Sequence, residues 1–171
     1  MRLTLSRHQC TFAHFNARSE LNGDERVPAA DLKIQTTIPN TLLEGFHPEL
    51  CAALYLFDGA QDDLPDIEQA RKVRRFHDLA AFPWGGSIVG ARVTLHIGVT
   101  GDQDVELVEC TIDKFVIEAL EGGSVEIAFR IKCEPSEHDA GKLYTLSQKL
   151  IELSIECPSA ETQAWPFTKD Y

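Results

Sequence analysis

The stretch that decides the fold is ARVTLHIGVTGDQDVELVECTIDKFVIEALEGGSVEIAFRIKC, residues 91–133. Apolar and polar residues alternate along it, as in Val93-Thr94-Leu95 near its start and Val125-Glu126-Ile127 near its end. A period of two is typical of a strand with one buried face. The glycines of residues 100–104 and 121–123 provide the two turns between alternating runs. We therefore predict a three-strand antiparallel meander.

The middle run of this meander is long for a single regular strand. Val105 and Leu107 follow one alternation, and Phe115 and Ile117 follow another on the far side of Asp113. A β-bulge inserts one residue and changes which side chains face inward. We predict a bulge or bend within residues 109–113.

Similar patterns flank the meander. Residues 11–21 and 31–38 read as two strands of a hairpin around the turn Asn22-Gly23, and residues 151–157 read as one more strand. Pro28 has no N–H for a strand ladder, so residues 27–30 are expected at an edge or a bulge.

Helical signals are short. Asn40 is a candidate N-cap for a helix over residues 41–54 that is broken at His47-Pro48. Apolar residues at spacings of three favour a second helix over residues 65–76, with a strand as the competing interpretation. Residues 142–149 are compatible with a helical turn before the last strand.

These elements predict an α+β fold that is mainly antiparallel β, either a sandwich of two packed sheets or one strongly bent sheet, with one or two short helices. A chain of 171 residues buries enough surface for one self-sufficient core, so we expect a single domain over residues 1–171. The tail, residues 158–171, is expected to pack loosely.

Composition excludes several classes of protein. The formal net charge of −11 disfavours a direct nucleic-acid binder, which depends on neutralising phosphates. No apolar stretch approaches the roughly 20 residues of a membrane helix, so no membrane partner is expected. The five cysteines have no paired spacing, which favours free thiols packed as small apolar side chains in a reducing cytoplasm.

Charge is unevenly distributed. Two acidic stretches have few basic residues within them: Asp58, Asp62, Asp63, Asp66 and Glu68, and then Asp102, Asp104, Glu106 and Glu109. Such clusters are either solvated faces or recognition surfaces for a basic partner. The basic run at residues 71–75 is either a phosphate contact or a charge balance for the first acidic stretch, and we favour the balance.

Two aromatic residues, Phe82 and Trp84, lie beside Gly85-Gly86. They are either an exposed anchor for a partner or a plug that closes one end of the core. Both interpretations stay open at this stage.

No catalytic or cofactor motif is present in the sequence, and we expect neither a cofactor nor catalysis. Glu134, His138 and Asp139 lie close together and are a candidate for binding a divalent ion, although a solvated polar turn explains them as well. A pocket that gathers a Cys or Ser, a His and a carboxylate within hydrogen-bond reach would overturn the non-enzymatic interpretation.

Four stretches of the sequence carry a resemblance to known proteins: FNARSELNGDERVPAADLKI (residues 15–34), FHPEL (residues 46–50), IDKF (residues 112–115) and EGG (residues 121–123). In these stretches the chain resembles uncharacterised proteins of tailed bacteriophages and prophages. The resemblance implies a viral origin and the bacterial host cytoplasm as location, and it supplies no activity and no functional residues.

Together these observations predict a non-catalytic phage protein that binds another protein. Its acidic residues would dock on basic host or phage nucleic-acid machinery, with Phe82 or Trp84 as anchor, and would act as an inhibitor of the anti-defence or anti-CRISPR kind. The alternatives are a phage structural or assembly protein that forms homo-oligomers and a metal-dependent hydrolase that uses Glu134, His138 and Asp139.

Overall fold

The computed structural model describes residues 1–57 and 71–159. Its elements are β1 (Leu5–Asn22), β2 (Glu25–Pro39), the 3₁₀ helix η1 (Asn40–Gly45), α1 (Leu50–Leu54), β3 (Tyr55–Phe57), β4 (Arg71–Arg74), β5 (Phe82–Trp84), β6 (Ile88–His96), β7 (Val105–Ala119), β8 (Ser124–Cys133), α2 (Glu137–Leu146) and β9 (Lys149–Glu156). The prediction of a mainly antiparallel β protein with short helices is confirmed, although the described residues form three short helices where one or two were expected. No helix within the described ranges combines the length and apolar character of a membrane span.

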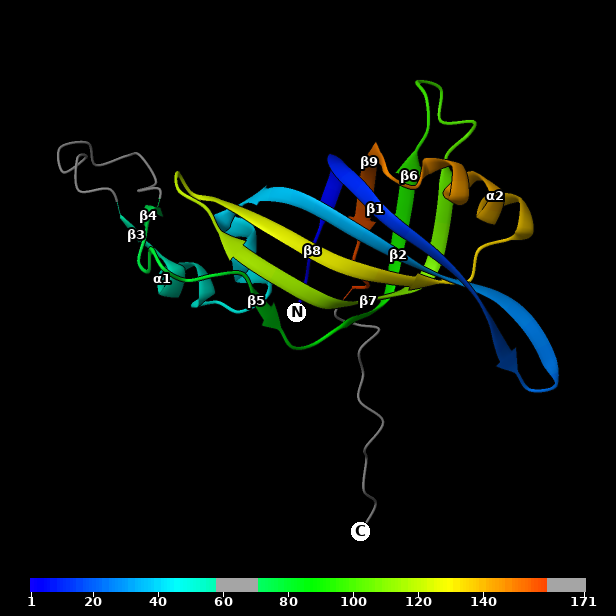
Figure 1. Cartoon of the computed structure of the whole chain (residues 1–171), viewed down its shortest axis with the longest axis horizontal. Coiled ribbons are helices and arrows are strands. Elements are labelled where there is room, and N and C mark those ends of the chain that lie inside the picture. The colour runs from blue at the N-terminus through cyan, green and yellow to red at the C-terminus, as the bar shows by residue number, and fades with distance from the viewer. Residues whose placement is uncertain (58–70, 160–171) are drawn as a thin grey trace, which may run out of the picture.

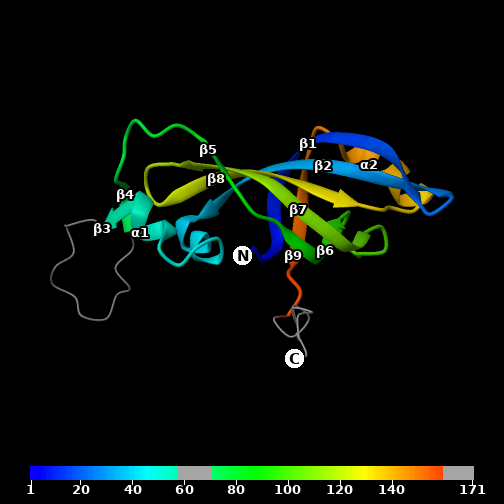
Figure 2. The same ribbon diagram turned by 90° about the horizontal axis from the view of Figure 1, so that it is seen from below.

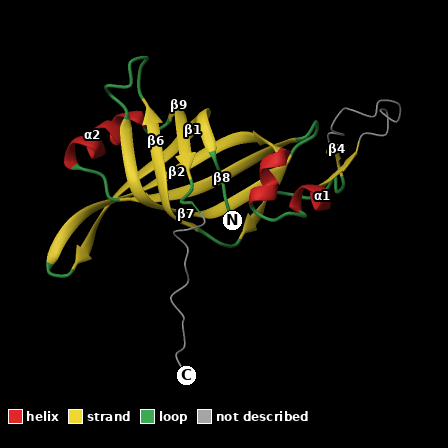
Figure 3. Cartoon of the chain, turned by 180° about the vertical axis from the view of Figure 1, so that it is seen from behind, coloured by secondary structure: helices red, strands yellow, loops and turns green. Residues whose placement is uncertain are grey.

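The main sheet closes on itself. Its strands follow the order β7-β6-β9-β1-β2-β8, and β8 pairs in turn with β7, so that six antiparallel strands form a ring (Figure 1). The short strand β5 adds to β7 beyond the end of β6, and β3 and β4 form a separate two-stranded sheet. The helices lie at opposite ends of the molecule, α2 at one end and η1 with α1 at the other (Figure 3).

The ring is filled by the inward residues of its strands. In β8 the buried positions alternate strictly with half-buried ones, and the inward members are Val125, Ile127, Phe129, Ile131 and Cys133. Inward residues of all six strands belong to one core cluster. The three predicted meander strands are β6, β7 and β8, and their pairings confirm the meander.

Aromatic rings occupy one part of this core. Phe115 of β7 is fully buried and meets Phe46 edge-on at 5.1 Å between ring centroids. It also contacts Phe129 of β8 at 5.8 Å. Phe115 therefore joins the segment after η1 to the inside of the ring.

The bulge predicted in the middle strand is present. Glu109 has a φ of 51°, and the pairing of β7 with β6 shifts between Leu107 and Cys110. A second shift follows in the pairing of β7 with β8 between Asp113 and Val116, where Lys114 also has a φ of 51°. A positive φ is costly for a residue with a side chain, so these positions are held by the surrounding pairings. The bulge changes the register of β7 along its length.

The helix predicted over residues 65–76 is wrong for the described residues 71–76, and the competing interpretation, a strand, is confirmed for residues 71–74. Residues 71–74 form strand β4, which pairs with β3, and residues 65–70 lie outside the described part of the chain. Tertiary contacts override the local helical spacing here. The Arg71 guanidinium lies 4.1 Å from the ring centroid of Phe57, and those of Arg74 and Arg75 donate to the carbonyl oxygens of Leu79 and Ala52.

The other helix predictions are confirmed in part. The predicted break at His47-Pro48 is present, because η1 ends at Gly45 and α1 begins at Leu50. Asn40, however, is not a cap: its side chain donates to the carbonyl oxygen of Arg71 at 2.6 Å. Helix α2 begins at Glu137, before the predicted start, because Ser136 caps it by accepting the N–H of Asp139 at 3.1 Å.

The N-terminal hairpin extends beyond the ring. Strand β9 pairs with β1 only as far as Phe12, and β8 pairs with β2 only from Ala30 onward. Among the residues that the structure describes, residues 18–29, here called the hairpin arm, therefore form strand pairings only with each other, and they project to the right in Figure 1. Pro28 lies in this one-sided part of β2, as its missing N–H predicts.

The aromatic cluster generates a stability prediction. Phe115→Ala should lower the free energy of unfolding by about 3–5 kcal/mol, because it removes a buried ring and leaves a cavity between Phe46 and Phe129. Urea unfolding measured by fluorescence tests it. The control is Val108→Ala on the same strand, where the side chain is 57% exposed and the change should stay within about 0.5 kcal/mol. Equal losses for both variants would contradict the prediction.

Candidate functional site

The predicted acidic surface is only partly described. Asp102 is exposed in the turn between β6 and β7, and Glu106 is exposed and pairs with Arg92 at 3.3 Å. Asp104 instead turns toward the protein, where its side chain is 18% exposed. The first acidic stretch, residues Asp58, Asp62, Asp63, Asp66 and Glu68, lies outside the described residues.

The strands beside that first stretch are distant from the second. β3 and β4 lie at one end of the molecule, whereas the turn after β6 lies near α2 in both views (Figures 1 and 2). The described residues therefore offer a small acidic surface at the β6–β7 turn.

The aromatic pair is partly integrated into the core. Strand β5 aligns Phe82 with Ile117 and Trp84 with Phe115 of β7. Both rings are half-buried and pack against the core cluster. Because Phe82 and Trp84 are half-buried, only part of each side chain is accessible to a partner.

A Ser, a His and an Asp form a continuous hydrogen-bonded chain. The Nδ1 atom of His96 lies 2.8 Å from Oδ2 of Asp104, and its Nε2 atom lies 2.7 Å from Oγ of Ser154. This is the bonding order of a catalytic triad, in which a carboxylate orients the imidazole and the imidazole faces the hydroxyl. The three residues come from β6, the β6–β7 turn and β9.

Backbone groups hold both ends of this chain. The Ile97 N–H donates to Oδ1 of Asp104 at 2.7 Å, and this bond, followed by that to His96, holds the pKa of Asp104 below its usual value despite partial burial. At the other end, the N–H of Arg7 donates to the Ser154 hydroxyl at 2.9 Å. Arg7 has a φ of 42° at an irregularity in β1.

Local sequence signals do not reveal this chain of residues. His96 and Ser154 are 58 positions apart and become neighbours only because β6 pairs with β9, which aligns Thr94 with Ser154 and His96 with Glu152. His96 also lines a groove of about 340 Å³ with Ile97, Gly98 and Leu146.

The metal-site candidate is not assembled. His138 and Asp139 belong to the first turn of α2, where Oδ2 of Asp139 accepts the Ser136 hydroxyl at 2.8 Å, so these two residues lie in a helix and not in the polar turn considered above. Among the residues that the structure describes, no group of three or more His, Cys, Asp or Glu side chains is arranged to hold a metal ion.

The cysteines behave as core residues. All five are free, and Cys157 alone is half-buried while the others are buried. Burial raises the pKa of Cys10 to about 11 and those of Cys110 and Cys133 to about 12. These three thiols are therefore protonated at neutral pH and are poor nucleophiles.

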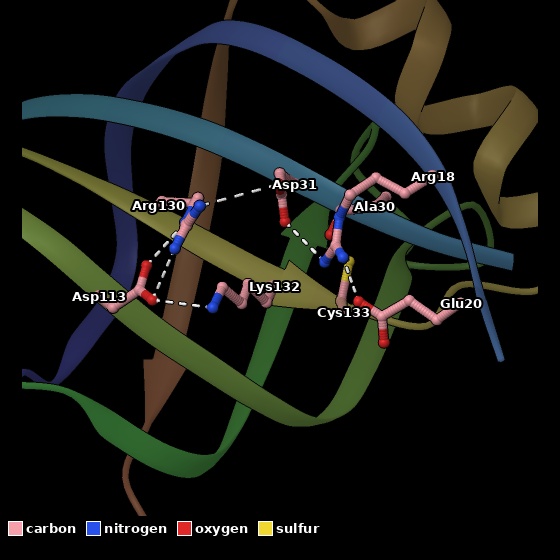
Figure 4. Close-up of polar contacts among 8 residues, drawn as sticks. All are labelled: Arg18, Glu20, Ala30, Asp31, Asp113, Arg130, Lys132 and Cys133. Carbon is pink, nitrogen blue, oxygen red and sulfur yellow. Dashed lines mark hydrogen bonds and ion pairs between the residues drawn. The ribbon is translucent and has the colours of Figure 1, made fainter. Parts of the chain in front are cut away.

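A row of ion pairs crosses the outer face of the ring (Figure 4). The guanidinium of Arg130 binds both carboxylate oxygens of Asp113, at 2.7 Å and 2.8 Å, and Lys132 approaches the same carboxylate at 3.1 Å. Arg18 reaches Asp31 at 2.9 Å and also pairs with Glu20. The hydrogen bond from Arg130, followed by that from Lys132, holds the pKa of Asp113 below its usual value.

Beside these ion pairs lies a groove of about 580 Å³ that crosses β1, β2, β8 and β7. We call it the basic groove because four of its lining residues are of basic types, namely His14, Lys33, Lys114 and Arg130. Its lining residues are His14, Asn16, Asp31, Lys33, Gln35, Lys114, Val116, Ala128, Phe129 and Arg130. Neither the groove nor the ion pairs were predicted, because both depend on the register of strands distant in sequence.

Comparison with protein-family models, with curated proteins and with solved structures finds no match to this chain.

The Asp113 ion pairs generate a pH prediction. Asp113→Asn should lower the free energy of unfolding at pH 7 by about 2 kcal/mol, because Arg130 and Lys132 lose their charged acceptor. Since the folded pKa of Asp113 is lowered, its stabilisation is complete above the unfolded pKa, near 3.9, and is lost as pH falls through the folded pKa. Urea unfolding from pH 7 to pH 2 should show the difference between the two proteins shrinking below about pH 4. A difference that is independent of pH would rule out this role.

Proposed function

We propose that the protein is a non-catalytic interaction factor that binds a partner protein through its hairpin arm. The observation that carries this proposal is the arm itself. Within residues 1–57 and 71–159 its strands pair only with each other, and residues 21–26 at its tip are all exposed. A projecting hairpin of this kind is accessible to a partner from both edges.

Two physical features make the arm suited to binding. The unpaired backbone groups of an edge strand can form a ladder with an extended segment of another protein. At the tip, Leu21 is 72% exposed and offers an apolar anchor. Burying a leucine side chain is worth about 1.5–3 kcal/mol, enough to change affinity by tenfold or more.

The biological setting is also a proposal. The resemblance to tailed-phage proteins supports a phage factor that acts on host or phage nucleic-acid machinery. The net charge of −11 favours a basic partner, with Asp102 and Glu106 as the described members of an acidic contact surface. Self-association through the arm remains the assembly alternative.

A pull-down from bacterial lysate tests the arm. Leu21→Asp should reduce capture of a specific partner at least tenfold, because the apolar anchor is lost. The matched control is Leu150→Asp on β9, a leucine that is 67% exposed outside the arm, and it should capture the partner normally. Undiminished capture by the Leu21 variant would refute the proposal. Changing Asp62, Asp63 and Asp66 together to Asn tests the acidic surface in the same assay.

A second candidate function is hydrolysis by Ser154, and the specific observation in its favour is the Ser154–His96–Asp104 chain. In such a reaction the Oγ–H proton passes to Nε2 of His96 while Oγ attacks a substrate carbonyl. His96 then protonates the leaving group, and water cleaves the resulting acyl-serine. We place this candidate second for two reasons. The N–H of Arg7 already donates to the same Oγ atom. Of the three residues only His96 lines the neighbouring groove, so that groove does not gather the three side chains in one pocket.

A fluorophosphonate probe, which reacts with activated serines, decides this candidate. Activated Ser154 should be labelled in the unmodified protein and not in Ser154→Ala, since the probe bonds to Oγ itself. Ser19→Ala in the exposed arm is the control and should not change labelling. An unmodified protein that resists the probe would eliminate hydrolysis by Ser154 and leave the three residues a structural connection between β6, β9 and β1.

A further inference from the structure

Basic side chains occupy neighbouring strands of the basic groove. The register aligns His14 of β1 with Lys33 of β2, and Lys33 with Arg130 of β8. Like charges directly opposite one another in a sheet are destabilising. Such a row is unexpected in a chain with a net charge of −11.

Two lysines of the groove have no ion-pair partner among the described residues. Arg130 is balanced by Asp113, but Lys33 and Lys114 are exposed and form no ion pair within residues 1–57 and 71–159. Lys114 also has its φ of 51° at the bulge of β7, a conformation that costs free energy. Its position at the bulge places it on the lining of the groove.

The remaining lining of the groove is amide and apolar. Asn16 and Gln35 contribute amide groups from β1 and β2, while Val116 is 38% exposed and aligns with Ala128 across β7 and β8. The groove therefore combines two lysines that have no ion-pair partner in the described part of the chain, amide hydrogen-bonding groups and an apolar strip. It crosses four strands, which suits an extended ligand.

We propose that the basic groove binds an acidic, extended segment of a partner protein. Carboxylates of the segment pair with Lys33 and Lys114, and an apolar side chain of the segment packs on Val116. The inference goes beyond the proposed function, because this surface is separate from the tip of the hairpin arm.

A short acidic segment fits this surface better than a nucleic acid does. Asp31 lies inside the groove, and Glu126 at its border pairs with Gln35. A long polyanion would meet these carboxylates and the acidic remainder of the molecule. A peptide can place two or three carboxylates on the lysines and leave its other positions uncharged.

The test uses a fluorescent eight-residue peptide of alternating Glu and Val, with binding followed by anisotropy at low salt. Lys33→Glu combined with Lys114→Glu should weaken binding at least tenfold, and rising salt should weaken binding to the unmodified protein. The control is Lys72→Glu combined with Lys149→Glu, which makes the same change in net charge at exposed lysines outside the groove. It should bind as the unmodified protein does. Thermal melts confirm that both variants fold.

Three results would overturn the proposal: equal affinity of the groove variant and the unmodified protein, equal weakening in both double variants, or tighter binding of a twelve-nucleotide oligothymidylate that depends on the same lysines. The same experiments test the arm proposal separately from the groove proposal. If Leu21→Asp abolishes partner capture and still binds the peptide, both proposals stand. Unchanged capture with peptide binding intact refutes the arm alone.

Discussion

The pairing of β9 with two strands at once is the interaction on which the ring depends. Two groups of strands pair with their neighbours along the chain through short turns or loops. One group is the hairpin of β1 and β2, and the other is the meander in which β6 pairs with β7 and β7 pairs with β8. The long-range pairing of β2 with β8 joins these two groups on one side, and β9 joins them on the other through β1 and β6. The Ser154–His96–Asp104 chain lies at this second junction, with the N–H of Arg7 from β1 bonded to the same serine.

The inner and outer faces of the ring differ in the side chains that they carry. The inside is filled by aliphatic and aromatic side chains, and the thiols among them keep their protons because burial opposes the thiolate. The outside carries charges at close spacing across the strands. Asp113 relieves the repulsion between Arg130 and Lys132, whereas Lys33 and Lys114 have no such relief within the described ranges. In the described part of the chain, the basic groove therefore holds unpaired lysines beside ion-paired residues.

Much of the fold could be predicted because strand alternation is a local signal. Residues 91–133 gave the meander and its bulge, and Asn22-Gly23 gave the hairpin. A helix is favoured over a strand for the segment that contains β4, because a spacing of three does not reveal the pairing with β3 that sets its backbone conformation. The start of α2 was missed although Ser136 and Asp139 carry a capping signal. His96, Asp104 and Ser154 were not connected, because their proximity follows from the register of β6 against β9.

The ring also has a consequence for how the chain reaches its folded state. Pairings such as Leu5 with Ile155 join residues that are nearly a whole chain apart. Such high contact order slows folding, because the chain loses the entropy of closing a long loop before the stabilising contact forms. The ribosome synthesises β9 after the other described strands. Until then, the edges of β1 and β6 that pair with β9 are unpaired and can bind another strand. Co-translational misfolding at those edges is the hazard that this architecture carries.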